Sequence, residues 1–171
     1  HQRVSNVRLQ GSAGRLQSRG ISEKTAELFK TYKDGKVLRH YYYDSSGTLV
    51  GAKVRTTDKQ FKCEGEVKTL YGMNLFKHKT TSKQKKLVIV EGEMDVLSFH
   101  EAGITNVISV PNGATLNSNN LDYLDNCIDY FTDKDKIIIA VDQDEPGQAL
   151  QAELVRRLGA EVCYLASFVD C

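Results

Sequence analysis

Two stretches of this chain share one design, in which a short apolar run ends on acidic residues and a helical pattern follows. In the first, residues 87–90 lead into the acidic segment 91–95. In the second, residues 136–141 lead into the acidic segment 142–147. Short runs rich in Val and Ile are typical of buried strands, and apolar residues at every third or fourth position are typical of helices. Each stretch is therefore predicted to be a strand, a tight turn and a helix, with carboxylates just beyond the strand.

The second half of the chain continues this alternation. A regular succession of strands and helices predicts a parallel sheet with right-handed crossovers and helices on its faces. The predicted fold class is therefore α/β. The expected strands are residues 87–90, 106–110, 136–141 and 161–165, and the expected helices are residues 93–102, 121–131 and 147–158.

Acids at the carboxyl ends of parallel strands are expected to meet in one crevice, where open α/β sheets bind their ligands. The acids concerned are Glu91, Asp142 and Asp144. Carboxylates placed together repel one another unless a cation is bound, and Mg²⁺ takes oxygen ligands while keeping positions open for substrate phosphates. Turn and helix-cap chemistry is the alternative for an isolated Asp-x-Asp. Glu93 and Glu145 are interpreted as first-turn helix acids rather than metal ligands.

A turn at the same edge of the sheet is a candidate phosphate site. It consists of Pro111, Asn112, Gly113 and Ala114 and follows another predicted strand. Backbone amides in such a turn can face a phosphate. An ordinary connection between strand and helix is the alternative.

A smaller unit is predicted ahead of the parallel sheet. Ser22 is the expected N-cap of a helix over residues 23–29. A β-hairpin and a third strand follow, because Tyr- and Val-rich runs flank a polar turn. Residues 64–86, which end in a Lys-rich run, are expected to be a surface connection between the two units. The three expected strands are residues 36–43, 48–56 and 59–63.

Basic residues recur in the second and third of these strands. The two-residue period of a strand places Lys53 and Arg55 on the face opposite its apolar side chains. Together with Lys59 and Lys62 of the next strand, they are expected to line one basic wall. The alternative is a solvated strand face, which is what most charge runs are.

Composition excludes several broad classes. A formal net charge of +1 is not the signature of a protein that binds nucleic acid over its whole surface. The four cysteines are far apart and lack a Cys-x-x-Cys pair, so no zinc site and no disulfide framework is expected. No apolar run is long enough to span a bilayer and no signal peptide is visible, so a soluble intracellular protein is expected. The start at His1 rather than Met indicates a piece of a longer protein.

Three motifs, in this order, resemble those of the Toprim domain that primases, topoisomerases and some nucleases share. They are Val-Glu-Gly-Glu-Met-Asp at residues 90–95, Val-Pro-Asn-Gly-Ala at residues 110–114 and Val-Asp-Gln-Asp-Glu-Pro-Gly at residues 141–147. The first motif is similar to its primase form. The resemblance covers residues 20–165 and implies a Rossmann-like parallel sheet flanked by helices, preceded by a small mixed α+β subdomain with antiparallel strands.

Upstream motifs are similar to those of the phage primase-helicases, a group that includes Twinkle-like proteins. Residues 53–55 and 58–62 resemble the basic motif of that group, and Leu70-Tyr71-Gly72 falls where it has a similar segment. The implied organisation is a linker or entry segment over residues 1–20, a basic subdomain over residues 21–84 and a Toprim subdomain over residues 85–171.

The resemblance implies the RNA polymerase domain of a DnaG-type DNA primase. Such an enzyme is a nucleotidyltransferase that makes short RNA primers on a single-stranded DNA template from nucleoside triphosphates, with Mg²⁺ or Mn²⁺. The implied partner is a replicative helicase, in the same chain or in a separate one. No association with a membrane is implied. The implied location is the cytoplasm of a bacterium or a phage-infected cell.

Motif matching also assigns roles to residues. Carboxylates would hold two ions that stabilise the attacking and leaving oxygens, and Lys and Arg would offset triphosphate charge. The implied catalytic and metal-binding residues are Glu91, Asp142 and Asp144, with Asp95 as a supporting catalytic acid. The implied nucleotide- and template-binding residues are Lys53, Arg55, Lys59, Lys62, Asn112 and Gly113.

Two other hypotheses remain open at this point. One is a catalytically quiet, primase-like DNA-binding module attached to a helicase, although such relatives have lost acids that are all present here. The other is a Toprim nuclease or topoisomerase. A topoisomerase needs a nucleophilic Tyr, and the cluster at residues 41–43 is interpreted as strand packing instead.

Overall fold

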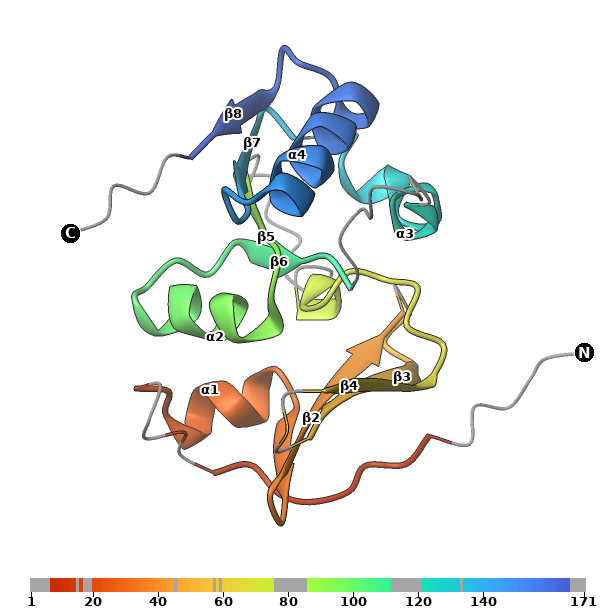
Figure 1. The fold of residues 1–171 in the computed structure, drawn as a ribbon, viewed down its shortest axis with the longest axis vertical. Helices are drawn as coiled ribbons and strands as arrows, with labels where there is room; N and C mark the ends of the chain where they lie inside the picture. The colour runs from red at the N-terminus through yellow and green to blue at the C-terminus, as the bar shows by residue number, and fades with distance from the viewer. Residues whose placement is uncertain are drawn as a thin grey trace, which may run out of the picture.

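The chain forms two four-stranded sheets that pack together through helices (Figure 1). The structure is a computed structural model. It describes residues 7–14, 16, 20–44, 46–56, 58, 60–75, 86–111, 121–132 and 134–166. In this described part, no helix is both long enough and apolar enough to cross a membrane.

The first sheet is antiparallel, with the order β1-β2-β3-β4. Helix α1 (Glu23–Leu28) precedes it, and the Ser22 side chain caps this helix by accepting a hydrogen bond from the Thr25 amide, as predicted. The predicted hairpin is confirmed as the pairing of β2 with β3. The strands are β1 (Thr31–Asp34), β2 (Val37–Tyr43), β3 (Leu49–Arg55) and β4 (Phe61–Gly65).

Strand β1 was not expected from the sequence, because Thr-Tyr-Lys-Asp is short and half polar. It forms because Gly35, with a φ of 63°, turns the chain back tightly so that β1 pairs with β2. Tyr32 and Tyr41 pack on the same side of this sheet, edge to face, against the segment that contains Val7 and Ala13. The sheet therefore buries one face beneath the N-terminal segment.

The second sheet is parallel throughout, with the order β6-β5-β7-β8. This confirms the α/β class and the alternation predicted for the second half. The strands are β5 (Lys86–Val90), β6 (Val107–Ser109), β7 (Lys136–Ala140) and β8 (Cys163–Leu165). The helices are α2 (Glu93–Glu101), α3 (Asp122–Asn126) and α4 (Glu145–Leu158), with short 3-10 turns η2 (Met73–Leu75) and η3 (Ile128–Tyr130).

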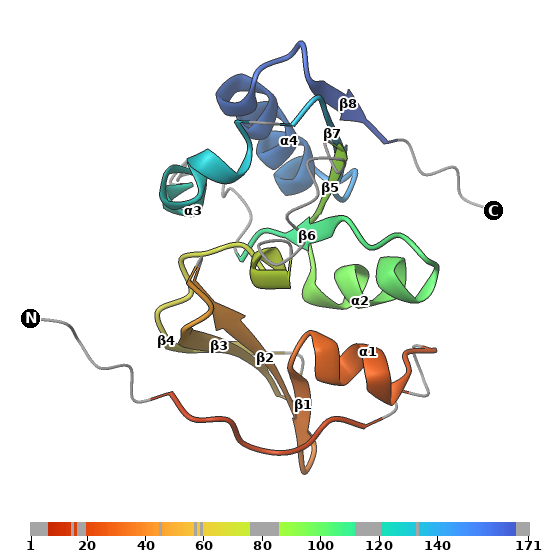
Figure 2. The same ribbon diagram turned by 180° about the vertical axis from the view of Figure 1, so that it is seen from behind.

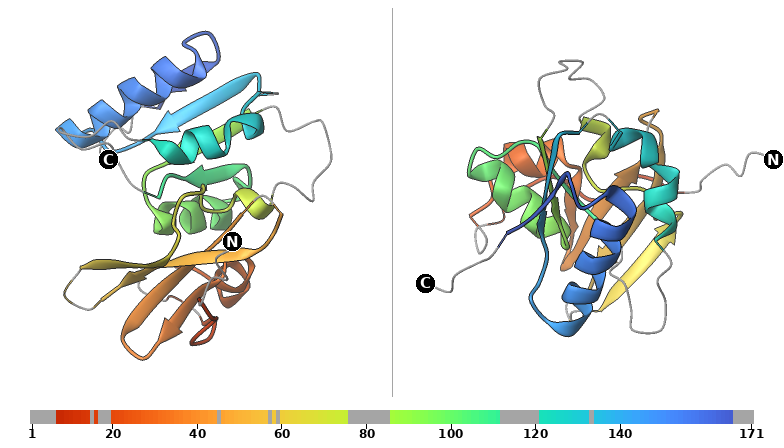
Figure 3. Two further views of the ribbon diagram at one scale, coloured as in Figure 1. Left: turned by 90° about the vertical axis from the view of Figure 1, so that its right-hand side faces the viewer. Right: turned by 90° about the horizontal axis from the view of Figure 1, so that it is seen from above.

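The two faces of the parallel sheet pack in different directions, because alternate residues of β5 point to opposite sides. Leu87 and Ile89 belong to a core with α3 and α4. Val88 and Val90 belong to a second core that includes α2 and reaches Tyr42 of the antiparallel sheet. Figure 2 and the left view of Figure 3 show α2 between the two sheets. Burying each such side chain contributes about 1.5–3 kcal/mol, so this shared core holds the sheets together.

The expected surface connection over residues 64–86 is wrong for its described middle part. Leu70, Tyr71 and Met73 are all at most 5 % exposed. Tyr71 forms an antiparallel bridge with Ser109, and its hydroxyl donates to the carbonyl of Phe29 at 2.9 Å. Hydrophobic spacing did not reveal this role, because a single bridge involves too few residues to leave a pattern.

Candidate functional site

Two of the predicted acids, Glu91 and Asp142, lie at the carboxyl ends of two neighbouring parallel strands. Glu91 follows β5 and Asp142 lies two residues beyond β7. The backbone amide of Asp142 donates to Glu91 Oε2 at 3.0 Å. The convergence predicted for these two residues is therefore present, and the Glu91 carboxylate links the two strand ends.

Glu91 lies in an environment that disfavours its negative charge. Burial raises the pKa of this carboxyl, the hydrogen bond from the Asp142 amide opposes that rise, and the charges of Asp142 and Asp144 raise the pKa further. A cation bound between these groups would reverse the effect of the two aspartates. The electrostatics at the strand ends therefore favour a positively charged ligand.

Asp144 acts as the N-cap of α4. Its Oδ1 accepts a hydrogen bond from the Gly147 amide at 2.8 Å. The backbone is packed tightly here, since a Cβ on Gly147 would lie 1.9 Å from the carbonyl oxygen of Asp142. The segment 142–147 thus holds Asp142 in place through a close backbone contact that only glycine permits.

The carboxylates satisfy some requirements of a divalent metal site. Within the described ranges, no three His, Cys, Asp or Glu side chains are close enough together to hold an ion as they stand. Glu91 and Asp142 nevertheless supply only oxygen donors, and Mg²⁺ is commonly bound by one or two carboxylates plus water and substrate phosphates. Glu91 and Asp142 therefore fit as ligands of such an ion, whereas the Asp144 carboxylate, the third predicted ligand, caps α4 and is not brought together with them into a three-acid site in the described part of the chain. The metal-binding role of these residues stays a prediction.

Asp95 is an exposed acid in the first turn of α2. Its Oδ2 lies 3.1 Å from the position that a Cβ on Gly92 would occupy, so the carboxylate folds back over the turn that follows Glu91. This position is compatible with the predicted supporting role of Asp95.

Lys53 reaches from β3 across to the parallel sheet. Its Nζ lies 3.1 Å from Glu93 Oε1 and donates to the Pro111 carbonyl at 3.1 Å. The Lys53 side chain is 15 % exposed and that of Glu93 is 5 % exposed. Lys53 therefore joins the antiparallel sheet to two segments of the parallel-sheet unit, the start of α2 and the end of β6.

Glu93 is the partner that the sequence did not reveal. It lies in the first turn of α2, as predicted, but it is also 4 % exposed and accepts a 2.5 Å hydrogen bond from the Tyr42 hydroxyl. Burial opposes ionisation of Glu93, yet nearby positive charge and the Tyr42 hydroxyl outweigh burial and lower its pKa. His40 has a pKa of about 4 because it is buried, so it is neutral at neutral pH and Lys53 supplies the charge there.

Cross-strand register determines which basic residues share a face. Arg55 pairs with Phe61 and Lys53 with Cys63, whereas Lys62 pairs with Val54. Residues directly opposite each other point to the same side of a sheet. The expected single basic wall is thus wrong for Lys62, which lies on the opposite face from Lys53 and Arg55.

Three predicted site residues fall outside the residues that the structure describes. They are Lys59, Asn112 and Gly113. Their expected roles in binding nucleotide or template stay predictions.

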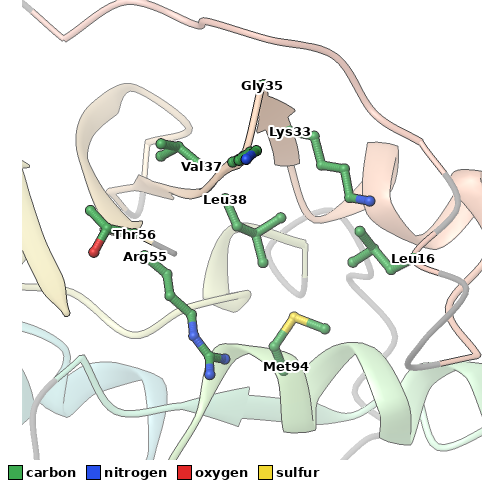
Figure 4. Close-up of a pocket in the computed structure, with 9 residues that line it drawn as sticks. Leu16, Lys33, Gly35, Val37, Leu38, Arg55, Thr56 and Met94 are labelled. Carbon is green, nitrogen blue, oxygen red and sulfur yellow. The ribbon is translucent and has the colours of Figure 1, made fainter. Parts of the chain in front are cut away.

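A cavity of about 270 Å³ lies between the antiparallel sheet and the start of α2 (Figure 4). Leu38 and Met94 form apolar parts of its wall, and the guanidinium of Arg55 extends toward Met94. Lys33 and Lys36 also line it. Arg55 therefore borders a partly apolar, partly basic hollow on the same side of the sheet as Lys53.

Comparisons with known proteins agree with this arrangement. Residues 85–166 match the Toprim domain family. The "Primase homolog protein" of Arabidopsis thaliana is 35 % identical, over 96 % of this chain and 53 % of that protein. The "Twinkle homolog protein, chloroplastic/mitochondrial" of the same plant is 36 % identical, over 86 % of this chain and 22 % of that protein. The chain thus spans about half or less of the length of these two relatives.

A solved structure extends the similarity to both sheets. The primase fragment of the bacteriophage T7 primase-helicase superposes with a TM-score of 0.75 and 29 % identity, over 96 % of this chain and 67 % of that fragment. This similarity includes the antiparallel sheet as well as the residues matched by the Toprim family. The chain therefore has the Toprim fold, and over nearly its whole length it is similar to proteins of the primase group, which includes the phage and Twinkle-type primase-helicases.

Proposed function

We propose that this chain is the primer-synthesising, RNA polymerase domain of a DNA primase. The observation that carries the proposal is the pairing of Glu91 with Asp142 at two parallel strand ends. Lys53 and Arg55 lie on the face of the antiparallel sheet that is turned toward the parallel-sheet unit. Basic side chains thus face the unit that carries the paired carboxylates, an arrangement that suits a reaction between a hydroxyl and a triphosphate.

In this reaction, the 3′ oxygen of a growing RNA strand forms a bond to the α-phosphorus of a nucleoside triphosphate, and the bond to pyrophosphate breaks. Divalent cations, when bound, would stabilise the attacking and leaving oxygens. Glu91 and Asp142 would hold the cations, and Gly147 would keep the Asp142 backbone in position. Arg55 would orient phosphate through paired N–H donors.

Lys53 would contribute mainly by position. Because it contacts both Glu93 and the Pro111 carbonyl, its ammonium group is fixed beside the turn that follows β6. A phosphate entering at this turn would meet a preoriented positive charge, with little conformational entropy left to lose. Supporting this, Lys53 is mostly buried, whereas an ordinary surface lysine is solvated.

The helicase partner and the cellular compartment are also part of the proposal. One relative is named a Twinkle homolog and the similar T7 fragment comes from a primase-helicase. We therefore expect a helicase to act with this domain, in the same chain or a separate one, on single-stranded DNA. The cytoplasm stays the location predicted from the sequence, whereas the Twinkle homolog is chloroplastic/mitochondrial by name. Imaging of the tagged full-length protein would separate these locations.

The test is extension of a short RNA primer annealed to single-stranded DNA, with nucleoside triphosphates and Mg²⁺ or Mn²⁺. The parent chain is compared with Glu91→Gln and with Glu145→Gln, a control in the exposed first turn of α4. We expect metal-dependent extension to be lost in Glu91→Gln and kept in Glu145→Gln. Mn²⁺ binding, followed by electron paramagnetic resonance, should weaken in Glu91→Gln alone.

Three other outcomes would contradict the proposal. Cleavage of the DNA would favour a Toprim nuclease. Absence of both extension and metal binding in the parent chain would favour the quiet DNA-binding module. Extension that survives Glu91→Gln would remove Glu91 from the catalytic site.

A further inference from the structure

One large aromatic side chain is exposed beside the face of the antiparallel sheet that carries Lys53 and Arg55, here called the basic face. Phe61 begins β4, the edge strand of the antiparallel sheet, and is 55 % exposed. Phe29 and Phe131, by contrast, are 5 % and 6 % exposed because they fill the cores. Packing within the described part of the chain therefore does not account for the position of Phe61.

Two cations flank this ring. Lys53 Nζ lies 4.8 Å from the ring centroid, and the Arg55 guanidinium carbon lies 5.8 Å from it. The pairing of Arg55 with Phe61 places both on one face of the sheet. Because Lys53 also contacts Glu93 and Pro111, this face is the one turned toward the parallel-sheet unit.

An exposed ring between two cations matches the chemistry of a nucleotide. Every nucleobase has a π-face that stacks on an aromatic side chain, and the phosphate next to it needs positive charge. Arg55 also borders the hollow in Figure 4, so there is room beside its guanidinium for a bound phosphate. An acidic peptide would use the charges without needing the ring.

We propose that Phe61 is a platform on which a nucleobase stacks, while Lys53 and Arg55 hold the adjoining phosphate. This inference rests on the proposed function and deepens it, since it assigns a base-binding position to the primase cleft. The base comes either from the DNA template or from a nucleoside triphosphate. Both sources offer the same chemistry, and binding measurements distinguish them.

The first arm measures binding of single strands by fluorescence anisotropy. Oligodeoxythymidine is compared with an abasic strand that has the same number of phosphates. Phe61→Leu should weaken binding of oligodeoxythymidine about tenfold, since one base stack is worth that much, and should leave the abasic strand unchanged. Phe61→Trp should retain binding, because it restores an aromatic face.

The second arm measures binding of a nucleoside triphosphate against inorganic triphosphate. A loss in Phe61→Leu for the nucleotide alone assigns the platform to the incoming nucleotide, whereas a loss for oligodeoxythymidine alone assigns it to the template. The proposal would be overturned if Phe61→Leu weakened binding equally for ligands with and without bases, or if it weakened binding in neither measurement.

A matched control exists on the other sheet. Tyr164 is 50 % exposed on β8, with Lys136 Nζ 4.6 Å from its ring centroid. Tyr164→Leu should leave binding of both the single strands and the nucleoside triphosphate unchanged, although it removes the same kind of cation–aromatic pair. Extension by the parent chain, measured on the same preparation, tests the proposed function separately, because a failure of the Phe61 platform leaves that activity in place.

Discussion

Glu93 and Lys53 form a largely buried ion pair that joins the two sheets, with Lys53 Nζ 3.1 Å from Glu93 Oε1. The Tyr42 hydroxyl supplies a second donor to the same carboxylate. A charge removed from water needs such partners, because its solvation is lost. This ion pair therefore helps to fix the position of the basic face relative to Glu91 and Asp142 on the parallel-sheet unit.

Glu93→Gln should destabilise the chain, because it leaves the Lys53 ammonium group buried without its counter-charge. Breaking a buried pair in this way costs about 3–5 kcal/mol of unfolding free energy. Urea unfolding monitored by circular dichroism measures the loss. The double variant Glu93→Gln with Lys53→Met should be more stable than Glu93→Gln alone. Additive losses from the two substitutions would show that the residues are not energetically coupled.

Arg55 and Lys62 should differ in nucleotide binding, because register places them on opposite faces of the antiparallel sheet. Arg55→Ala is expected to weaken binding of a nucleoside triphosphate about tenfold, which corresponds to one charge-assisted contact. Lys62→Ala removes the same formal charge and should change binding less than about twofold by the same relation. Isothermal titration calorimetry at one salt concentration makes the comparison. Equal weakening in both variants would contradict the assignment of faces.

Gly147→Ala should destabilise the protein although helix propensity predicts the reverse. Ala is better than Gly inside a helix by about 1 kcal/mol. At this position, however, the added Cβ would lie 1.9 Å from the Asp142 carbonyl oxygen. We expect a net loss of about 1–3 kcal/mol, as for other overpacked sites, together with weaker Mn²⁺ binding. Gly14→Ala is the matched control, because its Cβ would have no neighbour within 4 Å.

Stability should fall as the pH is lowered from 7 to 5, because His40 is buried in its neutral form. Its pKa is about 4 in the folded chain, below the ordinary value of 6.5. The unfolded chain therefore binds more protons between these values, and acid favours unfolding. The expected loss is about 2 kcal/mol at pH 5. His40→Gln should remove that slope from the urea unfolding free energy, and an unchanged slope would show that other groups cause it.

Sequence patterns revealed the parallel sheet because its two central strands, β5 and β7, are apolar on both faces and lead into acids. Residues 86–90 and 136–140 have the composition of buried strands, and their parallel pairing brings Glu91 and Asp142 together. The outcome for β1 was different, since its four residues carry no apolar period and its pairing depends on the turn at Gly35.

The basic face was only partly predictable, because a period of two within one strand does not reveal its register with the next. Lys62 was assigned to the wrong side for this reason. Glu93 shows a second limit. An acid in the first turn of a helix is common at the surface, and only the packing of Tyr42 and Lys53 over it shows that this one is buried.

The bridge between Tyr71 and Ser109 affects how the protein can be divided for experiments. A fragment cut at residue 85, where the Toprim family match begins, would lack the backbone partner of Ser109 and the side chains of Leu70 and Met73 that cover the core. It would expose an unpaired strand edge, which promotes aggregation. The unit suited to expression is therefore longer than the unit that sequence families recognise, and it begins upstream of Leu70.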